Sequence, residues 1–272
     1  MNCKRLFLLA AVMAFTSMMW AAGKVELPFT LCGQKVYRVD SLSKKTVGRE
    51  IVDAYRLVGV VDSGDVYYMP QKQALLLDNA VIDYRRKTCV IQCRDEVPLT
   101  LIIRGENHIT SIGSVLNAAG SVTIYGEGID KSMLCIHGLH KKGYKPPMYG
   151  LFTRGDMMLS DLTFNADGFA NAFYGKTIGD KQTTLLLERV QSDIVAQGYK
   201  PCVAKGFNYM QMCDCGPSRE QHGNHFIRYY DNHLQQDGEN CCELHLVADG
   251  GQQPTSPDRV IEQTNNTKIP HL

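Results

Sequence analysis

The chain has 272 residues, of which 44% are hydrophobic and 21% are charged, and its formal net charge is +1. A nearly neutral chain has no electrostatic attraction for nucleic acid or for an anionic membrane surface, which argues against both as partners. The length fits one sizeable domain, because repetitive β folds often form a single unit of this size.

Residues 1–23 have the pattern of a secretory signal peptide. Lys4 and Arg5 form a positively charged start, and residues 6–20 are an apolar stretch too short to span a membrane comfortably. Small residues at 21–23 place the predicted cleavage after Gly23, and a retained membrane anchor is the alternative. Cleavage leaves a net charge of −1 and no integral membrane segment. We therefore expect an exported protein, located in the periplasm, on the cell surface or outside the cell.

The segment 24–65 is irregular in pattern, and we expect it to cap the start of the domain that follows. Residues 27–37 predict two short strands joined by a glycine turn. Residues 43–57 predict a short helix or a loop, and the segment closes with a turn at 62–65. Beyond it, residues 66–77 predict either a hairpin or the first full coil of a repeat.

The middle of the chain consists of short apolar strands separated by glycine- and asparagine-bearing turns. Two runs end in a Gly-Glu turn, at 99–109 and 122–129, and a second form of the unit recurs at 77–83, 159–165 and 187–193. Units of this length cannot bury a core alone and must stack on one another. The sequence therefore predicts an all-β fold, a right-handed parallel β-helix over residues 66–248. Stacking in register would align Asp83, Asn165 and Asp193, and also Asp161 with Arg189.

Residues 64–128 resemble the secreted β-solenoid domains of gut Bacteroidetes, which are often described as carbohydrate-binding. The resemblance is carried by the motifs at 64–68, 74–79, 101–109 and 122–128. Residues 124–132 and 159–165 also resemble the early coils of pectin methylesterases and related pectin lyase-like β-helix proteins. The catalytic motifs of the esterases do not follow, and the single tryptophan, Trp20, lies in the signal. This second resemblance implies a β-helix and argues against esterase activity.

Cysteine and histidine concentrate in the last part of the domain, which we expect to cap its open end. Removing the signal leaves nine of ten cysteines. Because export permits disulfides, the disulfide candidates are Cys202, Cys213, Cys215, Cys241 and Cys242. Zinc binding and free buried thiols are the alternatives, but the spacings match no strong zinc signature, so we predict no metal site. Residues 249–272 predict a disordered tail.

Acidic and basic residues of the repeat provide the catalytic candidates. A β-helix lyase or glycosidase gathers acids, and often an arginine or lysine, on one groove to move protons. Here such a set would comprise Asp161, Glu188, Arg189 and Asp193. The alternative is that stacked polar residues are ordinary solvated faces of a solenoid.

Tyrosines provide the ligand-binding candidates, because aromatic faces pack on sugar rings. Tyr144, Tyr149 and Tyr174 are the residues concerned, although tyrosine-rich strands are also typical of β structure.

Three functions follow from these observations. The first is a non-catalytic exported protein that binds glycan or a cell-surface partner along a β-helix face. The second is a polysaccharide-active enzyme, and the third is a structural or adhesin-like solenoid. None of them calls for a cofactor.

Overall fold

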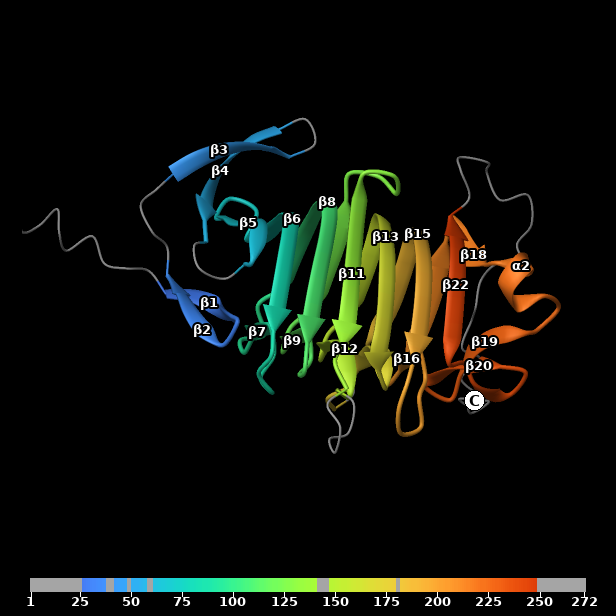
Figure 1. The fold of residues 1–272 in the computed structure, drawn as a ribbon. Coiled ribbons are helices and arrows are strands. Elements are labelled where there is room, and N and C mark those ends of the chain that lie inside the picture. The colour runs from blue at the N-terminus through green and yellow to red at the C-terminus, as the bar shows by residue number, and fades with distance from the viewer. Residues whose placement is uncertain are drawn as a thin grey trace, which may run out of the picture.

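The computed structural model describes residues 26–37, 42–47, 50–57, 61–140, 147–179 and 182–248. They form a nearly all-β molecule whose parallel coils stack into a β-solenoid of about five turns (Figure 1). The predicted fold class is thereby confirmed. The predicted signal at 1–23, the predicted tail at 249–272 and Tyr144 lie outside the described residues.

Each coil places one long stretch in the larger sheet and one short strand in the smaller sheet. The long stretches pair in parallel from coil to coil, and so do the short strands. In chain order the coils are β6 (Ala74–Tyr84) with β7 (Ile91–Cys93), β8 (Leu99–Ser111) with β9 (Leu116–Ala118), β10 (Val122–Gly126) and β11 (Ser132–Gly138) with β12 (Tyr149–Thr153), β13 (Met157–Phe169) with β14 (Asn171–Gly175), and β15 (Thr184–Ala196) with β16 (Ala204–Lys205).

A residue with left-handed backbone bends each long strand near its middle. These residues are Asn79 in β6 (φ 51°), Gly105 in β8 (φ 64°), Asp161 in β13 (φ 56°) and Arg189 in β15 (φ 48°). In the third coil the loop between β10 and β11 takes the same place. The bend splits every long strand into a first and a second half, so the two halves present different outer faces.

The core lies inside the coils and is built from stacked aliphatic and aromatic residues. Leu101, Ile124, Leu159 and Leu187 stand in register on successive strands and are at most 2% exposed. Phe164 of the larger sheet packs against Phe173 of the smaller one, with ring centroids 5.1 Å apart. Burial of such side chains from coil to coil is the main stabilising contribution in a solenoid.

A buried asparagine ties three coils together beside the bend. Asn107 is fully buried, and its Oδ1 accepts the main-chain N–H of Ala80 at 2.8 Å in the coil before. Its Nδ2 donates to the carbonyls of Arg104 at 2.9 Å and Met133 at 3.3 Å. One side chain therefore satisfies main-chain groups that the bend removes from the β ladder.

The N-terminal strands form antiparallel hairpins at one end of the solenoid (Figure 1). β1 (Glu26–Leu31) and β2 (Gln34–Tyr37) form the predicted pair, and β5 (Ser63–Met69) makes a hairpin with β6. The prediction of a helix or loop at 43–57 is wrong, because β3 (Leu42–Val47) pairs with β4 (Glu50–Arg56). Buried Val47, Val52 and Ala54 provide the apolar face that stabilises this hairpin.

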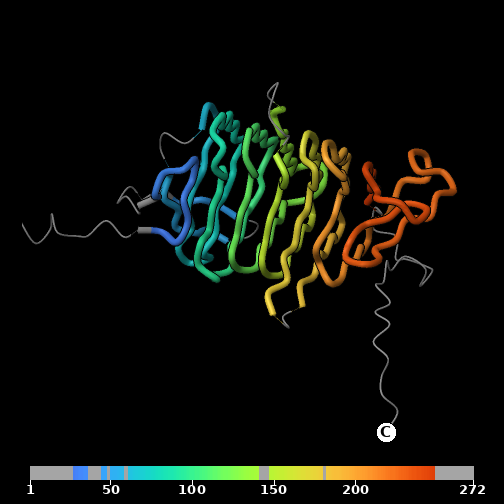
Figure 2. The backbone as a smooth tube through the Cα atoms, turned by 90° about the horizontal axis from the view of Figure 1, so that it is seen from below, coloured from blue at the N-terminus to red at the C-terminus, as the bar shows by residue number. Residues whose placement is uncertain are grey.

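The chain beyond the last coil covers the other end of the solenoid (Figure 2). It forms short antiparallel strands and one helical turn there. β22 (Glu243–Ala248) pairs antiparallel with the second half of β15 and with β18 (Cys215–Pro217), and β17 (Tyr209–Cys213) continues the first halves. β19 (Ile227–Tyr230), β20 (His233–Gln236) and β21 (Glu239–Asn240) extend the smaller sheet. α2 (Arg219–His222) lies beside them. Of these elements, β17, β20 and β22 pair directly with the last coil, where the stack would otherwise present open edges.

Asn107→Ala should lower the free energy of unfolding by about 1–3 kcal/mol, because it leaves the buried N–H of Ala80 without an acceptor. Urea unfolding followed by circular dichroism measures the change. The matched control is Gln92→Ala, which removes a half-buried amide on the outer face of β7 and should cost less than about 0.5 kcal/mol. Equal losses in the two variants would contradict the role given to Asn107.

Candidate functional site

Outward-facing polar side chains of the second strand halves line a groove of about 320 Å³. They alternate with buried Ile109, Ile136 and Ile194, whose side chains point into the core. We call this site the polar groove and define it by His108, Thr110, Cys135, His137, Asn165, Asp167, Asp193 and Val195.

The first row of the polar groove crosses five adjacent strands. His108, Cys135, Asn165, Asp193 and His245 stand opposite one another in register. Asn165 Nδ2 lies 3.7 Å from Cys135 Sγ, while Asn165 Oδ1 accepts the N–H of Asp193 at 3.0 Å. His245 Nδ1 lies 3.1 Å from Asp193 Oδ1. The predicted alignment of Asn165 with Asp193 is thereby confirmed.

The second row lies two residues further along the same strands. Thr110, His137, Asp167 and Val195 are paired in register, and Asp83 of β6 stands next to Thr110. His137 Nδ1 is 2.6 Å from Asp167 Oδ1, and both side chains are about half exposed. The alignment of Asp83 with Asn165 and Asp193 is therefore wrong, since Asp83 belongs to this second row. The reason is that Leu75, and not Leu77, stacks on Leu101.

The polar groove is lined mainly by side chains that can form hydrogen bonds. Its side chains are imidazoles, carboxylates, an amide, a hydroxyl and a thiol, with Val195 as the aliphatic member. Burial raises the pKa of the Cys135 thiol, so this group stays protonated at neutral pH. No group of three or more His, Cys, Asp or Glu in the described part of the chain is arranged to hold a metal ion.

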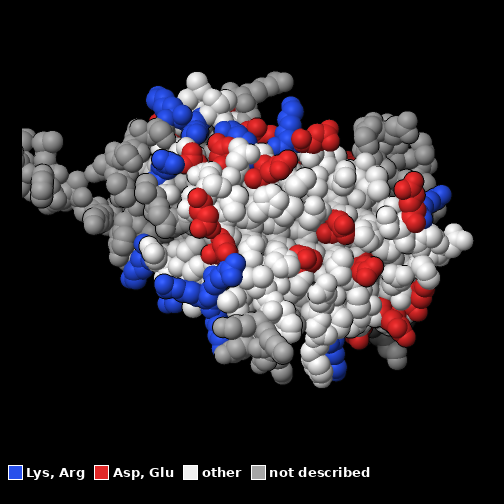
Figure 3. All heavy atoms as spheres, in the orientation of Figure 1, with Lys and Arg blue, Asp and Glu red and all other residues white. Residues whose placement is uncertain are grey.

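Charge is distributed unevenly over the face that carries the groove (Figure 3). Lysine and arginine gather over the N-terminal end, whereas the side of this face toward β15 and β22 carries scattered acidic residues among uncharged ones. The residues that line the groove include no lysine or arginine. A ligand that depends on positive charge, such as a polyanion, is therefore disfavoured in the groove itself.

A buried histidine supports the C-terminal end of the first row. His222 of α2 is 6% exposed, and its Nε2 accepts the main-chain N–H of His245 at 3.0 Å. The two imidazole rings lie 5.5 Å apart. Burial, followed by repulsion from His245, lowers the pKa of His222. His222 therefore holds β22 in place as a neutral acceptor.

Three of the four catalytic candidates meet at the bend, away from the polar groove. Arg189 binds Asp161 through two hydrogen bonds, Nε to Oδ1 at 2.6 Å and Nη2 to Oδ2 at 3.0 Å. Its Nη1 donates to Glu188 at 2.7 Å and lies 3.6 Å from Asp214. The predicted stacking of Asp161 on Arg189 is confirmed.

This bend cluster is arranged as an ion-pair network. Both oxygens of Asp161 accept hydrogen bonds from Arg189, and the hydrogen bonding to Asp161 raises the pKa of Arg189 further. An arginine with a raised pKa does not abstract protons, so the arrangement gives no acid and base pair. Asp193, the fourth candidate, lies in the polar groove instead.

The tyrosine candidates lie on the smaller sheet. The rings of Tyr149 and Tyr174 are tilted against each other with centroids 4.3 Å apart, and the Phe152 ring lies 5.5 and 5.8 Å from them. Burial raises the pKa of Tyr149. Because the rings pack on one another, much of their aromatic surface is already used within the protein.

The structure does not support the predicted disulfides. All nine cysteines among the described residues are free thiols, including Cys202, Cys213, Cys215, Cys241 and Cys242. Burial raises the pKa of Cys202 and Cys215 to about 11 and that of Cys241 to about 12. These three behave as small core residues, which was one of the alternatives that the sequence left open.

Sequence reasoning missed most of the polar groove. It singled out Asp193 and Asn165, but not His108, Cys135, His137 or Asp167. A short signal was present, because Leu134 and Ile136 alternate with Cys135 and His137, whereas 106–111 holds a single apolar residue, Ile109. Such alternation marks a strand with one exposed face.

No protein-family model, no curated protein and no solved structure matches this chain. The family resemblance seen in the sequence is therefore supported only for the fold, as a β-solenoid. Among the described residues, no helix has the length and apolarity that a membrane crossing requires.

Acid should loosen the cap at His222. Because folding lowers the pKa of His222 below 6.5, the unfolded chain binds more protons as the pH falls through that value, and stability is lost. The urea concentration at the unfolding midpoint of the wild type should therefore be lower at pH 5.5 than at pH 7.5. His222→Gln, which keeps an acceptor but does not titrate, should show a smaller fall. An identical pH dependence in both proteins would contradict this assignment.

Proposed function

We propose that the protein is an exported, non-catalytic binding protein that binds a glycan along the polar groove. The observation that carries the proposal is the pair of polar rows, which repeat hydrogen-bonding side chains from strand to strand. Neighbouring strands lie about 4.8 Å apart, so the rows present such groups at regular intervals along the solenoid axis. A chain-like ligand with many hydroxyl groups matches this arrangement.

Residue chemistry favours a glycan over a protein partner. Hydroxyl groups both donate and accept, which suits imidazole, amide and carboxylate side chains alike. Protein interfaces instead centre on aromatic or aliphatic anchors that the partner can reach. Of the aliphatic residues that line the groove, Ile109, Ile136 and Ala166 are buried in the protein, which leaves Val195 as the accessible one. Export, the second part of the proposal, rests on the signal pattern at 1–23.

The polysaccharide-active alternative has one supporting feature, because Asp167 and Asp193 both line the groove. The arrangement of the other candidates weakens it. Arg189 forms ion pairs with Asp161 and Glu188 at the bend. These three candidates therefore do not lie with Asp193 in the groove.

A glycan array probed with residues 24–248 should give binding that depends on the groove. His137→Ala and Asp193→Ala should each weaken binding about tenfold, because each removes hydrogen bonds of a charged or imidazole group. His233→Ala, on the smaller sheet, is the matched control and should bind like the wild type. Assays for new reducing ends and unsaturated products should stay negative.

Two results would contradict the proposal. Products from a bound glycan would make the protein an enzyme. A folded protein that binds no glycan, or equal losses in His137→Ala and His233→Ala, would remove the polar groove as a glycan site and favour a protein partner or a structural role.

A further inference from the structure

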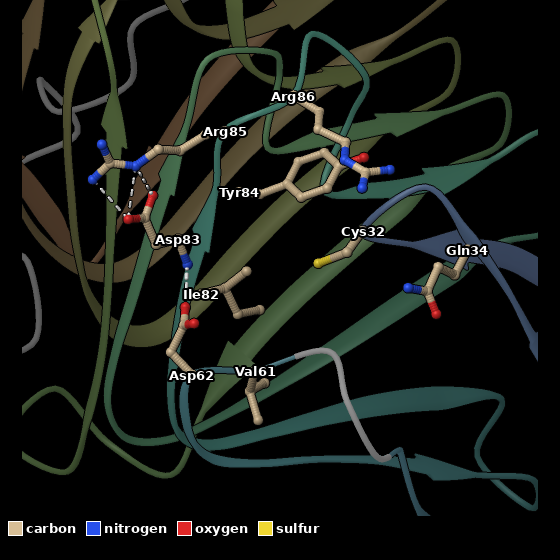
Figure 4. Close-up of a pocket in the computed structure, with 9 residues that line it drawn as sticks. All are labelled: Cys32, Gln34, Val61, Asp62, Ile82, Asp83, Tyr84, Arg85 and Arg86. Atoms are coloured by element: carbon tan, nitrogen blue, oxygen red, sulfur yellow. Dashed lines mark hydrogen bonds and ion pairs between the residues drawn. The ribbon is translucent and has the colours of Figure 1, made fainter.

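A second cavity lies at the N-terminal end of the solenoid, between the β1–β2 hairpin and the end of β6 (Figure 4). Its volume is about 360 Å³, which is in the range of small-molecule sites. It adjoins the second row of the polar groove, because Asp83 stands next to Thr110. The lining residues that matter for its chemistry are Cys32, Gln34, Asp62, Asp83, Arg85 and Arg86.

One positive charge of this pocket is already neutralised. Arg85 Nε donates to both carboxylate oxygens of Asp83 at 2.9 and 3.0 Å, and Nη2 lies 2.8 Å from Oδ2. The hydrogen bond from Arg85 lowers the pKa of Asp83. The pair therefore contributes little net charge to a ligand.

Arg86 provides the positive charge that remains. Among the described residues its guanidinium has no ion-pair or hydrogen-bond partner. In Figure 4 it lies on the same side of the pocket as Gln34, whose carboxamide is also available for a ligand. A guanidinium beside an amide donor is suited to a carboxylate, because it offers parallel N–H donors.

Asp62 faces the pocket from the opposite side in Figure 4. Its Oδ2 accepts the main-chain N–H of Asp83 at 2.7 Å, and its other oxygen has no partner in the described part of the chain. That oxygen can accept a hydrogen bond from an amino or hydroxyl group. A simple anion without such a donor would be repelled by Asp62.

The walls of the pocket are fixed before any ligand arrives. The N–H of Cys32 donates to the carbonyl of Val90 at 2.7 Å, and the N–H of Asp62 donates to that of Val81 at 2.8 Å. Burial, followed by the charge of Asp62, raises the pKa of the Cys32 thiol to about 11. Cys32 is therefore an uncharged wall residue that neither repels an anion nor acts as a nucleophile.

We infer that this pocket binds a small organic carboxylate that also carries an amino or hydroxyl group. The carboxylate lies on Arg86 and Gln34, and the donor group lies on Asp62. This binding activity is separate from glycan recognition in the polar groove.

Isothermal titration of the protein produced from the full chain with four probes tests the inference. L-serine and L-lactate carry both a carboxylate and a donor, acetate carries the carboxylate alone, and ethanolamine lacks the carboxylate. We expect at least one of the first two to bind at least tenfold more tightly than acetate and ethanolamine. Arg86→Gln and Asp62→Asn should each weaken that binding about tenfold, because each removes a charged hydrogen-bonding partner.

Arg94→Gln is the matched control, because Arg94 is an exposed arginine that does not line the pocket. Its affinity should equal that of the wild type. No heat with any probe, acetate binding as tightly as L-serine and L-lactate, or equal losses in Arg86→Gln and Arg94→Gln would overturn the inference. Glycan binding by Arg86→Gln should be unchanged, so a failure here is distinguishable from a failure of the glycan proposal.

Discussion

The left-handed bend in the middle of the long strands is the constraint on which the rest of this structure depends. L-residues adopt this backbone at a cost, and asparagine, aspartate and glycine tolerate it best. At Gly105 a Cβ would lie 2.1 Å from Asn79 Oδ1, so a side chain there would displace the Asn79 amide, which accepts the N–H of Glu106. Where arginine takes the position, at Arg189, its guanidinium binds Asp161 of the coil before. The ion pair and the bend thus support one another.

The bend also determines which polar side chains lie together on an exposed face. It directs the second strand halves onto their own face, on which every second residue points outward. The rows from His108 to His245 and from Thr110 to Val195 are the direct result of parallel register on that face. Charged residues at the bend, in contrast, satisfy one another. The polar groove and the ion-pair network are therefore separated by only a few residues along β13 and β15.

The fold was predictable from the sequence because coils repeat. The glycine and asparagine turns placed the strands, and the spacing of Leu159 and Leu187 gave the register that aligns Asn165 with Asp193. The same reasoning failed for Asp83, because Leu75 and not Leu77 occupies the position that stacks on Leu101, and this places Asp83 two residues further along, opposite Thr110. The hairpin at 42–56 was missed because its strands are short and rich in charged residues.

The groove was harder to predict than the fold, because its members come from different coils. His108, Cys135, Asn165 and Asp193 are 27 to 30 residues apart in sequence and meet only when the register is known. The disulfide prediction followed from the expected export and from the number of cysteines. Neither observation shows how far apart the sulfur atoms lie in the folded chain. Buried thiols such as Cys202 and Cys241 show that an apolar role accounts for these residues.

Hydrogen-exchange mass spectrometry with the glycan that gives the strongest array signal tests the central claim most directly. If the second strand halves form the binding face, the glycan should slow exchange in β11 and in the second halves of β13 and β15. Exchange in β12 and β14, which carry Tyr149 and Tyr174, should not change. Protection confined to β12 and β14 would contradict the account and move the binding site to the smaller sheet.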